Sequence, residues 1–207
     1  RINEFLNVAP EIHSNSEPDE FPDKFDISFD HVSFHYPENE VDALKEINFK
    51  LPQGKHVAII GKTASGKSTI AELLLRMYDP NSGSISIGGI DIKNLDLYQL
   101  RKSIAYVPQD VFLFSDTIAA NILFGEEGEP DTRSGRVQRV SEAAAIKTDI
   151  ESFPEQYQTI MGERGVTLSG GQKQRISLAR ALMKPADIFI LDDCLSAVDA
   201  HTEEHIL

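Results

Sequence analysis

The chain has 207 residues, of which 41% are hydrophobic and 26% are charged, so it can form one large domain with a hydrophobic core. Its formal net charge of −13 argues against binding to a nucleic-acid backbone, which requires clustered Lys and Arg. The single cysteine, Cys194, excludes an internal disulfide and is expected to be a small packed side chain.

The start of the chain is typical of a linker. Residues 7–24 are rich in Glu, Asp, Pro, Ser and Asn and show no periodicity, and the preceding "RINEFL" is compatible with the end of a helix. No apolar run approaches the ~18 residues that a bilayer-spanning helix needs. Because "AHTEEHIL" reads as an unfinished helix, we expect a fragment of a longer polypeptide. Residues 1–24 are then a linker, and residues 25–207 are one domain.

The first half of the chain predicts strands around one helix. "FDISFDHVSFHY" alternates apolar and polar residues, "INFKL" is a short strand, and "GKHVAIIG" is apolar enough for a strand buried on both faces. A helix is expected to begin near Gly66 and run through residues 68–79. Two further strands are expected in "GSISIGG", closed by Gly88 and Gly89, and in "SIAYVPQD".

The second half is more helical. Residues 117–125 and 136–146 show helical spacing and are separated by the loop "GEEGEPDTRSG", which indicates a helical subdomain within residues 115–153. "GGQKQRISLARALM" predicts another helix, and "DIFIL" predicts a strand. Because strands and helices alternate, we expect a mostly parallel sheet that binds its ligand at the carboxyl ends of the strands.

The segment "GKTASGKS", from Gly61 to Ser68, matches the phosphate-loop pattern G-x-x-x-x-G-K-[ST]. It follows an expected buried strand and opens an expected helix, which is the context that makes the match meaningful. Backbone N–H groups and the helix N-terminus supply partial positive charge, Lys67 can reach the β- and γ-phosphates, and Ser68 can ligate Mg²⁺. The alternative is an ordinary Gly/Ser turn between a strand and a helix.

The apolar run "IFIL" ends in two acidic residues, Asp192 and Asp193. An aspartate at the tip of such a strand can hold the hydration shell of a magnesium ion beside a phosphate loop. Taken alone, an aspartate pair in this place is more often a solvated turn or a helix cap. The phosphate loop elsewhere in the chain favours the magnesium interpretation.

A second glycine-rich motif, "LSGGQ" from Leu168 to Gln172, precedes the helix expected at 170–183. Ser169 can cap that helix, and the glycines permit the close approach of an anion. For an isolated SGG, a plain helix cap with a flexible lead-in is the simpler interpretation.

"LSGGQ" is also the signature of the ATP-binding cassette (ABC) family, and the chain resembles the nucleotide-binding domain of an exporter-type ABC transporter. The other family elements follow in the expected order. They are Tyr36 of "FHYP", which resembles the adenine-stacking aromatic, Gln109 of "VPQD", "GERG" from Gly162 to Gly165, and "SAVD" from Ser196 to Asp199. Without the resemblance, Tyr36 would be a core aromatic at a strand end and Gln109 part of an ordinary turn after a proline.

The resemblance implies an α/β fold: a P-loop NTPase core with a mostly parallel sheet, an N-terminal antiparallel β subdomain and an inserted α-helical subdomain at approximately 110–180. It implies that residues 1–24 lead from a transmembrane domain of the same polypeptide, at the cytoplasmic face of the cell membrane. The implied cofactors are ATP and Mg²⁺. The implied partner is a second ABC cassette, and the charge of −13 leads us to expect no nucleic-acid partner.

The resemblance also implies the site residues. Lys67, Gln109 and Asp193 are the expected catalytic residues, and Ser68, Gln109 and Asp192 the expected metal ligands. Because two cassettes of this family enclose ATP head to tail, Ser169–Gln172 is expected to cover the γ-phosphate held by the partner. The residues expected to contact nucleotide are Tyr36, Gly61, Thr63, Ala64, Ser65, Gly66, Lys67, Ser68, Thr69, Gln109, Asp192, Ser169, Gly170, Gly171 and Gln172.

The departure from the family pattern is Asp193, where the family has a glutamate that positions the attacking water. Aspartate carries the same charge on a side chain about 1.5 Å shorter, and a misplacement of about 1 Å can slow a reaction on the order of 100-fold. We therefore expect this site to bind ATP but to hydrolyse it slowly, while "LSGGQ" completes the site of a non-identical cassette. The alternative is that Asp193 still acts as the base through a shifted water.

Two other functions remain open. A soluble ABC-type ATPase acting as a mechanical switch in DNA repair or translation would share the motifs, although the charge of −13 argues against it. A P-loop kinase that phosphorylates a small acceptor would leave "LSGGQ" and "SAVD" without a role.

Overall fold

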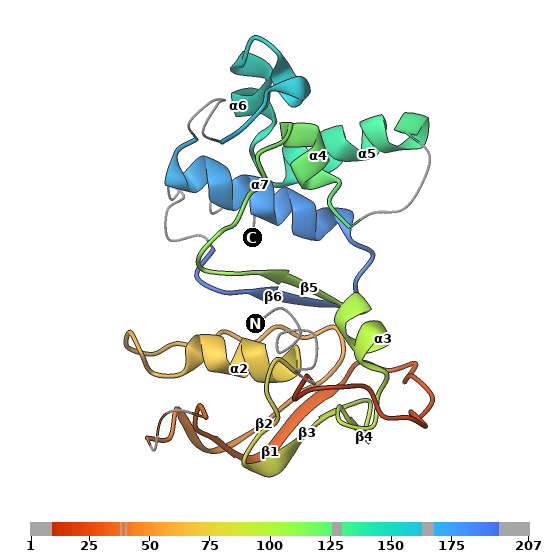
Figure 1. Cartoon of the computed structure of the whole chain (residues 1–207), viewed down its shortest axis with the longest axis vertical. Coiled ribbons are helices and arrows are strands. Elements are labelled where there is room, and N and C mark those ends of the chain that lie inside the picture. Colours follow the sequence, from red (N-terminus) through yellow and green to blue (C-terminus); the bar gives the residue numbers. More distant parts are fainter. Residues whose placement is uncertain (1–9, 38, 40, 126–129, 163–167, 195–207) are drawn as a thin grey trace, which may run out of the picture. The chain divides into compact units, whose positions relative to one another are not determined.

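The computed structural model describes residues 10–37, 39, 41–125, 130–162 and 168–194, except for the side chains of residues 130–134. The chain forms two compact units, residues 1–104 and residues 105–207 (Figure 1).

The first unit contains a four-stranded antiparallel sheet in the order β2-β1-β3-β4. Its strands are β1 (Ile27–Phe34), β2 (Leu44–Leu51), β3 (Ser82–Ile87) and β4 (Ile90–Asp91). Gly88 and Gly89, with φ of 59° and 83°, form the two-residue turn between β3 and β4, as the sequence predicts. This sheet confirms the expected N-terminal antiparallel β structure.

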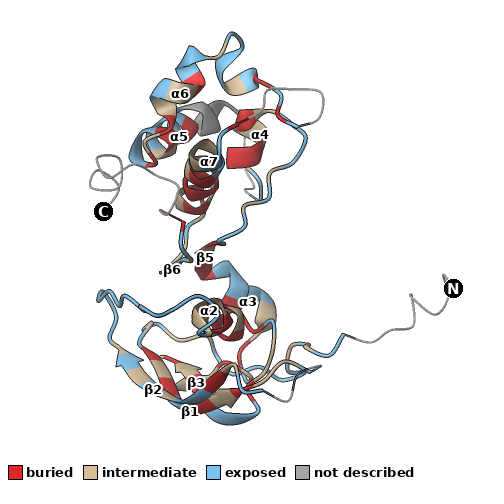
Figure 2. Cartoon of the chain, turned by 90° about the vertical axis from the view of Figure 1, so that its left-hand side faces the viewer, coloured by how far each residue is buried: buried red, intermediate tan, exposed pale blue. Residues whose placement is uncertain are grey.

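Helix α2 (Lys67–Leu74) lies over this sheet in both views, and α3 (Leu97–Lys102) follows β4 (Figures 1 and 2). Leu73 of α2 and Phe29 of β1 are completely buried. Figure 2 shows the buried residues of the first unit concentrated in α2 and in the strands beneath it. The core of this unit thus fixes the start of α2, where the phosphate loop ends.

The expected strand at residues 54–61 is wrong for this structure. Residues 55–62 have no regular secondary structure, and Val57, Ile59 and Ile60 are 51%, 43% and 93% exposed. A strand requires a neighbour that pairs with its N–H and C=O groups, and the sheet of the first unit pairs none of its strands with this segment. Apolar composition alone therefore did not make a strand here.

The described part of the expected linker, residues 10–24, contains neither a helix nor a strand. It is nevertheless attached to the first unit. The Leu97 N–H donates to Ser14 Oγ across 2.8 Å, and the Asp19 N–H donates to the Asn94 carbonyl across 2.9 Å. The segment therefore follows the surface of the first unit along the approach to α3.

The second unit contains the strands β5 (Ile104–Val107) and β6 (Ile188–Leu191), which pair with each other. The N–H that follows β6, on Asp192, donates to the carbonyl of Val107 at the end of β5, so the two strands run in parallel. Helical elements occupy the described chain between them, which confirms the inserted helical part. They are α4 (Ile118–Ile122), α5 (Pro130–Ala143), α6 (Lys147–Ser152), the 3₁₀ turn Gln156–Gln158 and α7 (Gly170–Met183).

Helix α7 contributes many residues to the hydrophobic core of the second unit. Its buried residues Ile176, Ala179 and Met183 pack with residues of β5, α4, α5 and α6. The bounds of α7 match the helix predicted from the sequence, whereas α5 begins earlier than predicted, at Pro130 within the expected loop 125–135. Proline suits the first turn of a helix because the N–H that it lacks would be unpaired there in any case. Among the described helices, none combines the length and hydrophobicity that crossing a membrane requires.

Candidate nucleotide site

The phosphate loop leads into α2 through two residues with left-handed backbone. Ala64 has φ of 62°, and Gly66, with φ of 84°, is the N-cap of α2. No side chain caps this helix, and its first turn contains no acidic residue. The N–H groups at the start of α2 therefore donate no hydrogen bond to a capping side chain. An anion-binding helix terminus requires N–H groups that are available in this way.

Gly66 is required by close packing as well as by its φ. A Cβ at this position would lie 2.5 Å from the Ala43 carbonyl oxygen and 2.7 Å from Leu44 Cδ2. Backbone atoms cannot move aside as a flexible side chain can. The loop is thus held against the start of β2 by a contact that only glycine permits.

The ammonium group of Lys67 lies back over the phosphate loop. Its Nζ donates to the carbonyl oxygens of Gly61 and Lys62, across 3.0 and 2.9 Å. Ser65 N–H donates to the same Lys62 carbonyl across 3.2 Å. The loop therefore forms a compact turn that holds the Lys67 ammonium near the backbone N–H groups of the loop. An anionic ligand bound there would be stabilised by the positive charge and by hydrogen bonds from these N–H groups.

Tyr36 lies two residues beyond β1 and is connected to α2. Its Oη donates to Glu72 Oε2 across 2.7 Å and lies 2.9 Å from Thr69 Oγ1, and burial raises the pKa of the phenol. Its ring meets those of Phe34 and Tyr78 edge-on, with centroids 5.0 and 5.4 Å apart.

Tyr36 is thus a packed aromatic at a strand end, as the alternative interpretation held, and it is also bonded to Thr69 in the first turn of α2, directly after the phosphate loop. Glu72 was not among the residues predicted from the sequence. The one signal for it was its place one helical turn after Ser68 and Thr69 on α2, on a helix that the motif had already located.

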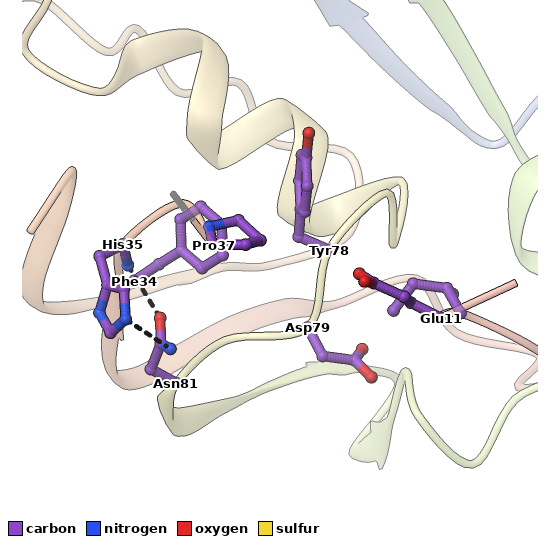
Figure 3. A pocket seen from close by; sticks show the side chains of 8 residues that line it. Glu11, Phe34, His35, Pro37, Tyr78, Asp79 and Asn81 are labelled. Carbon is purple, nitrogen blue, oxygen red and sulfur yellow. Dashed lines mark hydrogen bonds between the residues drawn. The ribbon is translucent and has the colours of Figure 1, made fainter. Parts of the chain in front are cut away.

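A pocket of about 370 Å³ adjoins the Tyr36 segment (Figure 3). His35 and Pro37 line it, and the His35 N–H donates to Asn81 Oδ1 across 2.8 Å. The carboxylates of Glu11 and Asp79 also line this pocket, so its lining is acidic. An acidic lining repels a triphosphate, so this pocket is not a phosphate site.

The acidic pair lies at the carboxyl end of β6, as the sequence predicts. Tyr106 Oη donates to Asp192 Oδ2 across 3.5 Å, and Gln109 Nε2 donates to Asp193 Oδ2 across 3.3 Å. Asp193 has a left-handed backbone, with φ of 49°. The structure thus brings together two of the residues expected to act on the nucleotide, Gln109 and Asp193.

Cys194 is 3% exposed and belongs to the core of the second unit, so the expectation of a small packed side chain is confirmed. Burial raises the pKa of its thiol, and the neighbouring carboxylates raise it further. A neutral, buried thiol is neither a nucleophile nor a metal ligand.

The signature segment forms a capping box at the start of α7. Ser169 Oγ accepts a hydrogen bond from the Gln172 N–H across 3.2 Å, and the Ser169 N–H donates to Gln172 Oε1 across 3.0 Å. The expectation that Ser169 caps this helix is confirmed. Gly170, like Ser169, is exposed, so the segment is open to a ligand.

The residues present fit ATP and Mg²⁺. The uncapped N-terminus of α2 and the Lys67 ammonium suit phosphate oxygens. The described residues include no cluster of three or more metal-ligating side chains. Mg²⁺ bound with a nucleotide needs only one or two protein oxygens beside phosphate and water. The Ser68 hydroxyl on α2 and the Asp192 carboxylate after β6, each considered within its own unit, are oxygens of this kind.

Part of the predicted site lies outside the described residues. These are the residues after Gly162 in "GERG" and the whole of Ser196–Asp199. The Gly162 backbone, with φ of 109°, passes so close to Ser115 that a Cβ would lie 2.6 Å from its Oγ. A glycine is therefore required at this first position of "GERG".

Comparison with known proteins gives a consistent result. The profile of the ABC transporter family matches residues 44–196. The probable multidrug resistance ABC transporter ATP-binding/permease protein YheI of Bacillus subtilis is 46% identical over 207 residues, which are 100% of this chain and 35% of that protein. The multidrug resistance-like ATP-binding protein MdlA of Escherichia coli is 44% identical over 208 residues, 100% of this chain and 34% of that protein.

Among solved structures, a bacterial Atm1-family ABC exporter with ATP bound is similar, with a TM-score of 0.89 and 37% identity over 99% of this chain and 35% of that chain. The chain spans about a third of the length of the curated relatives that it matches in full. The phosphate loop, the acidic strand end and the capped "LSGGQ" segment lie within the region that the family profile covers. The chain belongs to the ABC transporter family and is a nucleotide-binding domain, an ATPase cassette with a P-loop fold, of the kind that these exporter proteins contain.

Proposed function

We propose that this cassette binds ATP with Mg²⁺, closes against a second cassette around the nucleotide, and drives substrate export through a transmembrane domain of the same polypeptide. YheI is named an ATP-binding/permease protein, the similar solved structure is an ABC exporter, and the chains of YheI, MdlA and that exporter are about three times as long as this one, which supports a fused membrane domain. The proposal places the cassette at the cytoplasmic face of the membrane. It treats residues 1–24 as the linker and residues 25–207 as the ATP-binding domain, with its helical subdomain at approximately 110–180.

The observation that carries the proposal is the phosphate loop, where an uncapped helix terminus and the ammonium of Lys67 are held on one short turn. In the proposed site the backbone N–H groups of residues 61–69 donate to phosphate oxygens, and Lys67 leaves its carbonyl partners for the β- and γ-phosphates. Thr69 contributes its N–H rather than its hydroxyl, because that hydroxyl is paired with Tyr36 and the side chain is buried. Tyr36 supports the base with its ring.

Two residues are proposed to supply oxygens to Mg²⁺. Ser68 of the phosphate loop supplies its hydroxyl, and Asp192, which follows β6 in the second unit, supplies a carboxylate oxygen. Gln109 orients Asp193, with which it is hydrogen-bonded, and Asp193 holds the attacking water. Ser169, Gly170 and the backbone at the start of α7 present donors to the γ-phosphate of the nucleotide that the partner binds.

We further propose that the chain's own site hydrolyses ATP slowly, and that the partner is a non-identical cassette. The support is the length of the Asp193 side chain, which is about 1.5 Å shorter than the glutamate of the family pattern. The backbone does not make up for the shorter side chain. Asp193 has a left-handed φ, and its carboxylate is directed toward Gln109. The signature segment, in contrast, is intact and fully capped.

An exposed aromatic cluster supports contact with a membrane domain. Phe112 and Phe124 are 67% and 57% exposed, and Phe114 lies between them with ring contacts to both. The Arg180 guanidinium lies over Phe114 and Phe124 and donates to the Phe112 carbonyl. Because this cluster begins three residues after Gln109, a partner bound to it would act directly on the segment that orients Asp193.

The alternative, a soluble ABC-type ATPase in DNA repair or translation, is disfavoured by the net charge of −13 and by the exporter relatives.

The proposal is tested by nucleotide titration of the full-length protein and its Lys67→Ala variant. Loss of two charge-assisted hydrogen bonds to phosphate removes about 3 kcal/mol, so ATP affinity should fall about 100-fold or more. Lys55→Ala, which removes an exposed lysine outside the loop, is the control and should bind like the wild type. Unchanged affinity in Lys67→Ala would overturn the assignment of the phosphate loop.

A further inference from the structure

Both ends of the Gln172 amide make hydrogen bonds within its own unit. Its Oε1 accepts the Ser169 N–H across 3.0 Å, and its Nε2 donates to Asp149 Oδ1 across 2.8 Å. These two bonds connect the signature segment to α6 through the Gln172 side chain. The expected contact between Gln172 and nucleotide remains a prediction.

Asp149 lies in the first turn of α6, where a carboxylate is favoured by the helix dipole. Its second oxygen, Oδ2, accepts a hydrogen bond from Arg175 Nη2 across 3.1 Å. Gln172 and Arg175 are three residues apart on α7, so one carboxylate holds two neighbouring positions on the same face of the helix.

Arg175 depends on this contact. Its side chain is only 12% exposed, and its Nε is buried without a hydrogen-bond partner among the described residues. Asp149 is the one carboxylate that pairs with it in the described chain. Because a buried guanidinium is costly without a counterion, the Asp149 carboxylate fixes Arg175 and thereby the rotation of the first turns of α7.

We propose that Asp149 is a positioning residue for ATP hydrolysis: through Gln172 and Arg175 it sets the orientation in which Ser169 and Gly170 meet the γ-phosphate of the partner's nucleotide. This inference rests on the proposed function. Ser169 Oγ accepts the Gln172 N–H, which leaves its own proton to donate outward. The direction of that donation is set by the capping box, and the capping box is held by Asp149. Asp149 itself does not contact nucleotide.

The test compares Asp149→Ala, Asp149→Asn and the control Glu151→Ala in the full-length protein copurified with its partner cassette. Glu151 is an exposed carboxylate on the same helix. The measurements are the kcat and KM for ATP, and hydrogen exchange of the backbone amides of residues 168–173. The exchange measurement reports the orientation of the segment whether or not ATP is hydrolysed.

Asp149→Ala should lower kcat about 10-fold or more while KM changes less than about 2-fold, because the nucleotide is bound by the phosphate loop. Exchange at residues 168–173 should become faster. Asp149→Asn keeps an acceptor for Gln172 and should recover part of kcat, and Glu151→Ala should match the wild type in both measurements. Combining Asp149→Ala with Gln172→Ala should cost clearly less than the sum of the two single changes, since both break the bond between Asp149 and Gln172.

Wild-type kcat and exchange in Asp149→Ala would overturn the inference. So would a loss of kcat that is additive with Gln172→Ala, because Asp149 would then act only on the stability of the fold. If the wild type hydrolyses no ATP and Lys67→Ala binds it normally, the proposed function fails. The exchange rates still decide whether Asp149 holds the segment.

Discussion

Gln109 Nε2 donates a hydrogen bond to Asp193 Oδ2 across 3.3 Å, and this contact joins the segment after β5 to the acidic residue after β6. The two strands are parallel, so both side chains emerge at the same end of the pair. A residue at the entrance to the helical part is thereby connected to the carboxylate proposed to hold the attacking water. The contact also fixes the direction of a side chain that is shorter than the family pattern requires.

Gln109→Ala should therefore impair turnover more than binding. Loss of the amide releases the Asp193 carboxylate. Turnover at this chain's own site, measured with a partner cassette whose phosphate-loop lysine is changed to alanine, should fall about 10-fold, while the affinity for ATP should change less than about 2-fold. Gln138→Ala, an exposed glutamine of α5, is the matched control. Steady-state hydrolysis and equilibrium binding separate the two effects. A loss of affinity equal to the loss of turnover would show that Gln109 acts on binding instead.

The contributions of the ring and the hydroxyl of Tyr36 can be measured separately with two variants. Tyr36→Ala removes the ring and should weaken ATP binding by about 1–3 kcal/mol if the ring stacks on the base. Tyr36→Phe keeps the ring but loses the contacts with Glu72 and Thr69, so the free energy of unfolding should fall by about 1 kcal/mol with little change in affinity. Tyr98→Phe, at a tyrosine that is 70% exposed, is the control. Normal affinity in Tyr36→Ala would leave Tyr36 a packing residue alone.

Glycine at position 66 is tested by comparison with position 54. Both have a left-handed φ, of 84° and 72°, but a Cβ at Gly54 meets nothing within 4 Å. Gly54→Ala should cost about 1–2 kcal/mol of folding free energy from backbone strain. Gly66→Ala adds the clash with the Ala43 carbonyl oxygen and should cost more, and it should also weaken ATP binding. Chemical denaturation of both variants is the measurement, and equal destabilisation would mean that the loop has room to adjust.

The sequence predicted the local features well because their signals are local. Helix α7 and its Ser169 cap follow from a serine, two glycines and a glutamine in the right order, and the turn at Gly88 and Gly89 follows from residues that tolerate positive φ. The connection of Asp149 to α7 could not be predicted in the same way. Its partners are 23 and 26 residues away, and nothing in the intervening sequence sets their distance.

The same limit explains the strand expected at residues 54–61. Its apolar residues fit a buried strand, but a strand forms only where a neighbouring strand pairs with it. The composition of a segment does not predict which strand that would be. Likewise, Glu72 became a partner of Tyr36 only once α2 lay over the sheet (Figure 1). Motifs thus identified the chemistry of the site, whereas the contacts that hold it depended on packing between distant segments.

The central claim is that Asp193 is one methylene too short for efficient hydrolysis. It is tested by ATP turnover of the full-length protein and of Asp193→Glu, each paired with a partner cassette whose own phosphate-loop lysine has been changed to alanine, so that only this chain's site can work. The account predicts slow turnover in the wild type and a rise of about 10-fold or more in Asp193→Glu. Wild-type turnover within the range of roughly 1–10³ s⁻¹ that is typical of enzymes, with no gain in Asp193→Glu, would contradict it.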